Sequence, residues 1–122
     1  MLNPIKLANK NFLSSLDTSK EELIHILNIA KTFKNKNLNI KLEDKVLGLI
    51  FDKSSTRTRV SFQVAMSRLG GTTIDLNPTT SQIGRGEPIK DTARVLSRYC
   101  DVLAIRTFNH SDLEEYAVFM DS

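Results

Sequence analysis

Residues 46–51 form a short run, Val-Leu-Gly-Leu-Ile-Phe, that contains no polar side chain. A half-buried strand alternates apolar and polar residues, whereas a strand buried on both faces of a sheet is apolar throughout. Strands of this second kind occur mainly in parallel sheets that helices cover on both faces. The run therefore predicts an α/β protein in which residues 46–51 are a doubly buried strand.

The rest of the sequence alternates between helical and strand patterns. In chain order we predict a helix opened by the capping box Ser19–Glu22, the strand 46–51, a helix from Ser54 to Leu69, a strand from Thr72 to Leu76, a helix from Asp91 to Tyr99, a strand from Val102 to Ile105 and a helix opened by a second capping box, Ser111–Glu114. Such βαβ units predict a parallel sheet with right-handed crossovers and helices on both faces. We expect residues 1–122 to form a single domain.

Two of the predicted helices carry an apolar face at helical spacing. These faces consist of Phe62, Ala65, Met66 and Leu69 in one helix and of Ala93, Leu96 and Cys100 in the other. We interpret these residues as core positions, with Cys100 acting as a small buried hydrophobe. Gly70-Gly71 ends the first of the two helices, since a glycine suits the left-handed backbone that follows many helices.

The composition argues against several kinds of partner. The chain has no apolar run of membrane-spanning length, and its first residues lack the basic and then apolar order of a secretory signal. Its single cysteine cannot form an internal disulfide, which fits a reducing cytoplasm. The net charge is a mild +3, and we interpret the lysines from Lys31 to Lys45 as a solvated helix end and loop rather than a nucleic-acid patch. We therefore expect a cytoplasmic protein with neither a membrane nor a nucleic-acid partner.

Residues 54–59, Ser-Ser-Thr-Arg-Thr-Arg, lie between a predicted strand and a predicted helix. Free N–H groups at a helix N-terminus, hydroxyl groups and guanidinium groups together favour a phosphate-like anion. The alternative is an ordinary N-cap with exposed arginines. Arg57 and Arg59 are two residues apart and cannot both face a ligand from an ideal helix. Either the first turn wraps around the anion or one arginine is structural, with Glu87 as a candidate partner for Arg59.

Ligands of parallel α/β sheets bind beyond the carboxyl ends of the strands. Three segments follow predicted strands here, namely residues 54–59, the polar loop 77–88 and Arg106, and we expect them at one edge of the sheet. Two common phosphate motifs are absent from the sequence. No glycine-rich loop ends in Gly-Lys-Ser/Thr, and Gly84-Arg85-Gly86 lacks the third glycine of a dinucleotide motif because position 89 is Ile89.

Together, Ser55–Arg59, Val60–Phe62 and Leu69–Gly71 resemble the carbamoyl-phosphate signature of the aspartate/ornithine carbamoyltransferase family, and Ser81–Glu87 with Lys90–Tyr99 is similar to its ornithine branch. The resemblance implies a carbamoyl-phosphate-binding domain. It also implies transfer of the carbamoyl group to the δ-amine of ornithine, which gives citrulline and phosphate in arginine metabolism. Two alternatives stay open: an aspartate or other amine acceptor, and a non-catalytic phosphate-binding fragment.

The resemblance further implies roles for individual residues. Those that bind carbamoyl phosphate would be Ser55, Thr56, Arg57, Thr58, Gln82 and Arg106. Arg57, Thr58 and Arg106 would be catalytic, whereas Arg59 and Glu87 would give structural support. No metal or cofactor is implied. Members of the family work as trimers, in which the loop that contains Gln82 can reach a neighbouring subunit.

The family's next motif, His-Pro-x-Gln, and its ornithine-binding domain do not occur before Ser122. We therefore expect a carbamoyl-phosphate domain that is incomplete at its C-terminus and inactive by itself. We interpret His25 as a packing or surface residue of the first helix. For His110 we favour a loop or capping role, with a place at the substrate edge as the alternative.

Overall fold

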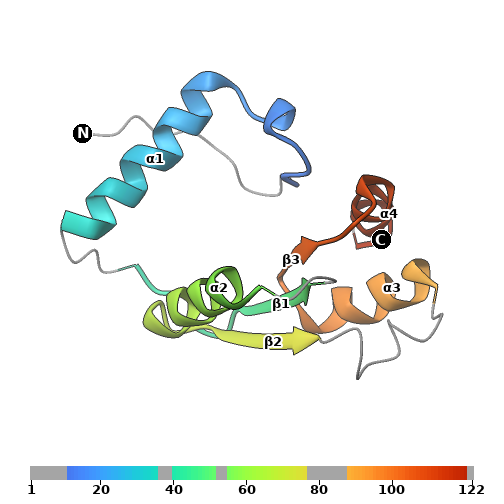
Figure 1. The fold of residues 1–122 in the computed structure, drawn as a ribbon. Helices are drawn as coiled ribbons and strands as arrows, with labels where there is room; N and C mark the ends of the chain where they lie inside the picture. The colour runs from blue at the N-terminus through green and yellow to red at the C-terminus, as the bar shows by residue number, and fades with distance from the viewer. Residues whose placement is uncertain (1–10, 36–39, 52–54, 77–87, 121–122) are drawn as a thin grey trace. The chain divides into compact units, whose positions relative to one another are not determined.

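The computed structural model describes residues 11–35, 40–51, 55–76 and 88–120. The chain divides into two compact units, residues 1–40 and residues 41–122. The first unit contains a short 3-10 helix, η1 (Ser15–Asp17), and the helix α1 (Lys20–Asn35). The second contains a sheet and three further helices (Figure 1). Within the described ranges, no helix combines the length and the apolar composition needed to cross a membrane.

A reciprocal capping box opens α1, as its sequence predicts. The Ser19 hydroxyl oxygen accepts a hydrogen bond from the Glu22 N–H at 3.1 Å, and the Glu22 carboxylate accepts one from the Ser19 N–H at 2.8 Å. Two N–H groups that would otherwise lack acceptors at the helix terminus are thereby satisfied. The same helix holds His25, which is partly buried.

The second unit is built on a three-stranded parallel sheet with the order β2-β1-β3. Its strands are β1 (Val46–Phe51), β2 (Thr72–Leu76) and β3 (Val102–Arg106), as the apolar patterns predict to within a residue. Every residue of β1 after Val46 is buried. The central strand is therefore the one whose sequence is apolar throughout, because it alone among the three has a strand on either side and side chains covered on both faces.

Helices cover both faces of the sheet, which confirms the predicted fold class (Figure 1). These helices are α2 (Thr56–Arg68), α3 (Ile89–Tyr99) and α4 (His110–Met120). On one face, the β1 side chains Leu47, Leu49 and Phe51 form a core against which Met66 of α2 packs. On the other face, Ile50 of β1 joins a core formed with α3 and α4, namely Ala93, Leu96, Cys100 and Tyr116. The predicted core face of α3 is thus confirmed.

The end of α2 confirms the role expected of its paired glycines. Gly70 has a φ of 86°, in the left-handed region that a side chain disfavours. The Gly70 N–H donates to the Ser67 carbonyl at 3.2 Å, and the Gly71 N–H donates to the Met66 carbonyl at 2.8 Å. This pair of bonds closes the helix by a Schellman motif and lets the chain turn into β2.

Other details of α2 and α3 differ from the prediction. Helix α2 begins at Thr56 because Ser55 has an extended φ of −150° and occupies the N-cap position. Phe62 is 38% exposed and Ala65 is also exposed, whereas Met66 and Leu69 are partly buried. Of the four residues predicted to form the core face of α2, only Met66 and Leu69 are partly buried. Helix α3 begins at Ile89, ahead of the expected Asp91, because Pro88 takes its N-cap position.

The second predicted capping box is wrong. Helix α4 begins at His110, so Ser111 lies inside the first turn rather than in front of it. The Asn109 carbonyl already accepts the Asp112 N–H at 3.0 Å, which starts the helical bonding before Ser111. The Glu114 carboxylate instead lies 3.5 Å from Nε2 of His110, one helical turn away.

Candidate anion-binding site

The carboxyl ends of the three strands lie at one edge of the sheet. Phe51, the last residue of β1, is the register partner of Arg106, the last residue of β3. On the other side, Ile50 pairs with Leu76, the last residue of β2. The N-terminus of α2 follows β1 directly in the chain and Arg106 ends β3, so two of the three expected segments meet at this edge. Gln82 and Glu87 of the third segment lie outside the described residues.

The N-terminus of α2 is open to an anion. Ser55 occupies its N-cap position, but the Ser55 side chain makes no cap hydrogen bond. The N–H groups of a first helical turn have no acceptor within the helix, and they carry the positive end of the helix dipole. The first turn of α2 contains no acidic residue that would compete for them. The first turn of α2 therefore presents N–H donors and positive charge that the Ser55 side chain does not satisfy, as in helix N-termini that bind anions.

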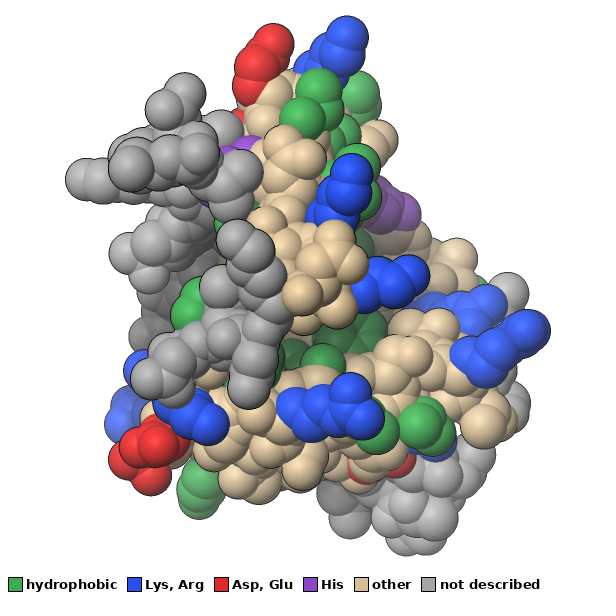
Figure 2. Space-filling model, turned by 90° about the vertical axis from the view of Figure 1, so that its left-hand side faces the viewer, with side chains coloured by type: hydrophobic (Ala, Val, Ile, Leu, Met, Phe, Trp, Pro, Cys, Tyr) green, Lys and Arg blue, Asp and Glu red, His purple; other side chains and the backbone are tan. Residues whose placement is uncertain are grey.

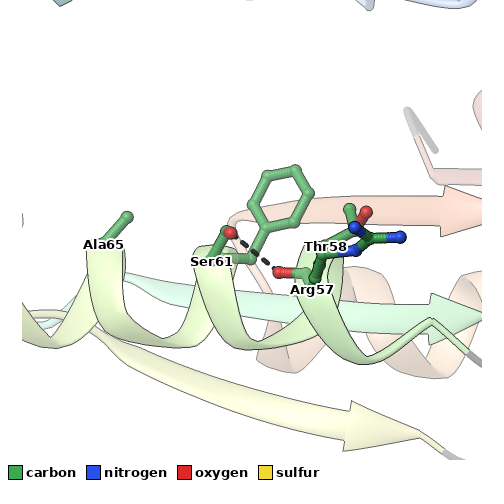
Figure 3. A pocket seen from close by; sticks show the side chains of 5 residues that line it. Arg57, Thr58, Ser61 and Ala65 are labelled. Atoms are coloured by element: carbon green, nitrogen blue, oxygen red, sulfur yellow. Dashed lines mark hydrogen bonds between the residues drawn. The ribbon is translucent and has the colours of Figure 1, made fainter.

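An open pocket lies along α2 next to these groups (Figure 3). It is lined by Arg57, Thr58, Ser61, Phe62 and Ala65. Figure 3 shows the side chains of Arg57 and Thr58 at the N-terminal end of the helix, with Ala65 at the far end of the pocket. The Ser61 hydroxyl donates to the Arg57 carbonyl at 2.7 Å and is therefore occupied within the helix. The polar functions left at the mouth of this pocket are the guanidinium of Arg57 and the hydroxyl of Thr58.

The two arginines of the segment have different surroundings. Arg57 is exposed and lines the pocket. The Arg59 side chain is only 25% exposed, and its Nε lies 3.4 Å from Oδ2 of Asp75 on β2. Its guanidinium also lies 5.5 Å from the ring centroid of Phe51. Of the two possibilities left open by the sequence, the structure supports the one in which Arg57 faces the site and Arg59 is structural.

The described ionic partner of Arg59 is Asp75, a residue that the sequence analysis did not single out. Glu87, the partner expected from the sequence, lies outside the described residues. No signal in the sequence marks Asp75, because its strand reads Thr-Thr-Ile-Asp-Leu, with polar and apolar residues mixed, and its contact with Arg59 depends on how α2 packs on the sheet.

The other expected site residues that the structure describes do not line the pocket. Ser55 and Thr56 are the N-cap and first residue of α2, and Arg106 is exposed at the end of β3. Figure 2 shows Lys and Arg side chains at several places over the face that it views. Ser55, Thr56 and Arg106 are placed by their elements at the carboxyl edge of the sheet.

Other reactive side chains lie away from this edge or are already engaged. His110 is exposed and pairs with Glu114 on α4. Cys100 is buried, and burial together with the negative charge of Asp101 raises the pKa of its thiol. Across the described residues, no group of three or more His, Cys, Asp or Glu side chains is placed to hold a metal ion. The described residues around the pocket supply hydrogen-bond donors and a guanidinium.

The fold and the site define an α/β domain with a helix N-terminus suited to an anion beyond the carboxyl edge of a parallel sheet. Residues 10–121 match the family model described as aspartate/ornithine carbamoyltransferase, carbamoyl-P binding domain. The chain belongs to this family.

Relatives in the ornithine branch are similar to the chain in sequence and fold. An ornithine carbamoyltransferase of Prochlorococcus marinus (strain MED4) is 82% identical over 117 residues, covering 96% of this chain and 38% of that protein. The structure of ornithine carbamoyltransferase from Pyrococcus furiosus has a TM-score of 0.86 at 46% identity, covering 95% of this chain and 38% of that chain. The chain thus spans little more than a third of the proteins it matches.

The fold is shared with the aspartate branch. Aspartate transcarbamoylase from Trypanosoma cruzi in complex with carbamoyl phosphate has a TM-score of 0.85 at 29% identity, covering 98% of this chain and 40% of that chain. Backbone similarity therefore does not separate the two branches, whereas two proteins named ornithine carbamoyltransferase are 82% and 80% identical to the chain over 117 residues.

Proposed function

We propose that the chain is the carbamoyl-phosphate-binding part of an ornithine carbamoyltransferase and acts within a longer enzyme. The observation that carries this proposal is the N-terminus of α2, where the Ser55 side chain makes no cap hydrogen bond and Arg57 and Thr58 border an open pocket. A carbamoyl phosphate dianion fits that position because the N–H groups, the helix dipole and a guanidinium all favour negative charge. The 82% identity to a protein named ornithine carbamoyltransferase supports ornithine as the acceptor.

The proposed reaction is a direct acyl transfer. The δ-amine of ornithine attacks the carbonyl carbon of carbamoyl phosphate with its lone pair, and the carbonyl π electrons move to oxygen in a tetrahedral intermediate. When the carbonyl re-forms, the bond from carbon to the phosphate oxygen breaks and phosphate leaves with the electron pair. The attacking nitrogen loses a proton, which the released phosphate takes up, and citrulline is formed.

The residues of the site would act by position and charge. Arg57 and the first-turn N–H groups of α2 hold the phosphate, with Ser55 and Thr56 as further donors. Thr58 and Arg106 orient the carbonyl and stabilise the negative charge that grows on its oxygen. Preorganised donors of this kind contribute most where the transition state gains charge, and each is worth on the order of 100- to 1000-fold in rate.

Further properties belong to the proposed enzyme as a whole. Gln82 would contact carbamoyl phosphate from the loop after β2, in a homotrimer in which that loop reaches a neighbouring subunit. Ornithine would be held by residues outside this chain. The cytoplasm and arginine biosynthesis are the proposed setting, and no metal or cofactor takes part. Residues 1–122 would then be an incomplete carbamoyl-phosphate domain.

Citrulline formation from carbamoyl phosphate and ornithine tests the proposal directly. We expect the full-length enzyme to produce citrulline, to use ornithine at least tenfold more efficiently than aspartate, and to lose activity when reduced to residues 1–122. The efficiency is measured as kcat/KM for each acceptor. A preference for aspartate would assign the chain to another transcarbamylase. Citrulline formation by residues 1–122 alone would contradict the claim that the acceptor site lies elsewhere.

A further inference from the structure

Asp75 connects α2 to the sheet through Arg59. It lies on the edge strand β2, beside Leu49 of β1, and its carboxylate reaches Arg59 on the second turn of α2. The two side chains are 25% and 31% exposed, so water screens their attraction less than it screens a pair at the surface. The guanidinium of Arg59 also lies against Phe51, the last residue of β1. One side chain of α2 is thus held by both neighbouring strands.

The orientation of Arg59 fixes that of Arg57. A helix turns about 100° per residue, so side chains two residues apart point to nearly opposite sides. With Arg59 directed toward the sheet, Arg57 is directed away from it, and it lines the open pocket together with Thr58 (Figure 3). A rotation of the first turn that brought Arg59 to the pocket would take Arg57 away.

The pair also depends strongly on the charge of Asp75. Arg59 Nε is fully buried and makes no hydrogen bond, so its contact with Asp75 is an ion pair held by charge. Removing one partner of a partly buried ion pair leaves the other charge without its counter-ion, and the cost grows with burial. Without the carboxylate, the Arg59 guanidinium would lose the described ionic contact that holds it against the sheet.

We propose that Asp75 is a positioning residue for carbamoyl phosphate binding. By holding Arg59 against the sheet, it determines that Arg57 is the guanidinium presented to the ligand. This inference rests on the proposed function, since it concerns the same site.

A double-mutant cycle in the full-length enzyme tests the inference, with carbamoyl phosphate affinity measured by calorimetry. We expect Asp75→Asn to weaken binding about 10- to 100-fold, because small displacements of a binding group have effects of that size. In an Arg59→Met background the same change should have little further effect, because Asp75 acts through Arg59. Asp75→Glu, which keeps the charge, should recover most of the affinity.

Two measurements separate positioning from a general loss of structure. Thermal unfolding shows whether the Asp75→Asn protein is folded at the temperature of the binding assay. Glu115→Gln removes the same charge from an exposed position on α4, and it should leave the affinity unchanged. The KM for carbamoyl phosphate should rise in the Asp75→Asn enzyme while the KM for ornithine changes little.

Three results would overturn the inference. The first is normal carbamoyl phosphate affinity in the folded Asp75→Asn enzyme, and the second is an equal loss of affinity whether or not Arg59 is present. Either one, with a wild-type enzyme that binds carbamoyl phosphate, leaves the proposed function intact. The third is a wild-type enzyme that binds no carbamoyl phosphate, which overturns the proposed function as well.

Discussion

Phe51 and Arg106 face each other in register as the last residues of β1 and β3. The chain continues from Phe51 into α2. The end of β3, which carries Arg106, and the N-terminus of α2 therefore belong to the same edge of the sheet. The same Phe51 ring contacts Phe62 of α2 edge to face, with the ring centroids 6.4 Å apart. Local packing around β1 thereby fixes the start of α2 relative to the strand ends.

Arg57→Ala should weaken the binding of carbamoyl phosphate and of inorganic phosphate about 10- to 100-fold. The reason is the loss of charge-assisted hydrogen bonds to the phosphoryl oxygens, which contribute about 1.5–3 kcal/mol each. Lys34→Ala removes a positive charge from the last turn of α1 and should leave both affinities unchanged. Calorimetry of the full-length enzyme measures both effects. Equal losses in the two variants would contradict the assignment of the site.

Arg106→Ala should lower kcat by about 100- to 1000-fold while the protein stays folded. Arg106 is assigned to the carbonyl oxygen, where negative charge grows in the transition state, so its removal affects the reaction more than binding. Arg98→Ala removes a guanidinium from the exposed last turn of α3 and serves as the matched control. Steady-state citrulline formation gives kcat and KM for each variant. A variant that lost only carbamoyl phosphate affinity would place Arg106 at the phosphate instead.

Ser19→Ala should destabilise α1 by about 1 kcal/mol, because it removes half of a reciprocal capping box. Ser111→Ala should change the stability of α4 by no more than about 0.5 kcal/mol, since Ser111 lies within the first turn and alanine is a good helix former. Amide hydrogen exchange reports on each helix separately. A loss of protection in α4 as large as that in α1 would restore the capping role to Ser111.

Gly48→Ala should destabilise the protein by about 1–3 kcal/mol through overpacking. A methyl group at position 48 would lie 2.5 Å from Cδ2 of Leu103 and 3.1 Å from the Cys100 sulfur. Urea unfolding should show a lower midpoint at an unchanged slope. In a Leu103→Val background, where the clashing carbon is absent, the same change should cost less. A cost independent of Leu103 would mean that the clash is not its cause.

The stability of the protein should fall with rising pH on account of Cys100. Burial, with the charge of Asp101 adding to it, raises the pKa of this thiol in the folded state. As the pH rises through the ordinary thiol range near about 8.5, the unfolded chain loses the proton first, so the free energy of unfolding decreases until the folded pKa is passed. Urea unfolding across that range should give a shallower pH dependence for Cys100→Ala. Identical slopes for the two proteins would exclude this origin.

The two capping boxes show what a local pattern can and cannot predict. Ser19–Glu22 and Ser111–Glu114 have the same arrangement of serine and glutamate, and only the first opens a helix in the predicted way. At the second, the backbone is already helical from His110, with the Asn109 carbonyl accepting a bond from Asp112. A side chain can cap a helix only where the chain enters it, and that point depends on the segment that comes before.

The order of elements and the chemistry of the site followed from the sequence alone. The continuous apolar run of β1 and the apolar residues of α3 at helical spacing reflect strand and helix geometry, so both elements could be predicted. The paired glycines that end α2 could be predicted from their backbone preference. Hydroxyl and guanidinium residues after a buried strand likewise indicated an anion, and family membership followed from the same segment. These are properties of neighbouring residues, which a linear sequence records directly.

Only the tertiary structure decided which arginine lines the open pocket and which packs against the sheet. Arg57 and Arg59 are equivalent candidates in the sequence, and they differ because Asp75 and Phe51, from two separate strands, hold Arg59 against the sheet. In the same way, the pairing of Phe51 with Arg106 depends on the register of two strands that lie far apart in the chain. Interactions of this kind arise from packing between elements, and no periodicity along the chain encodes them.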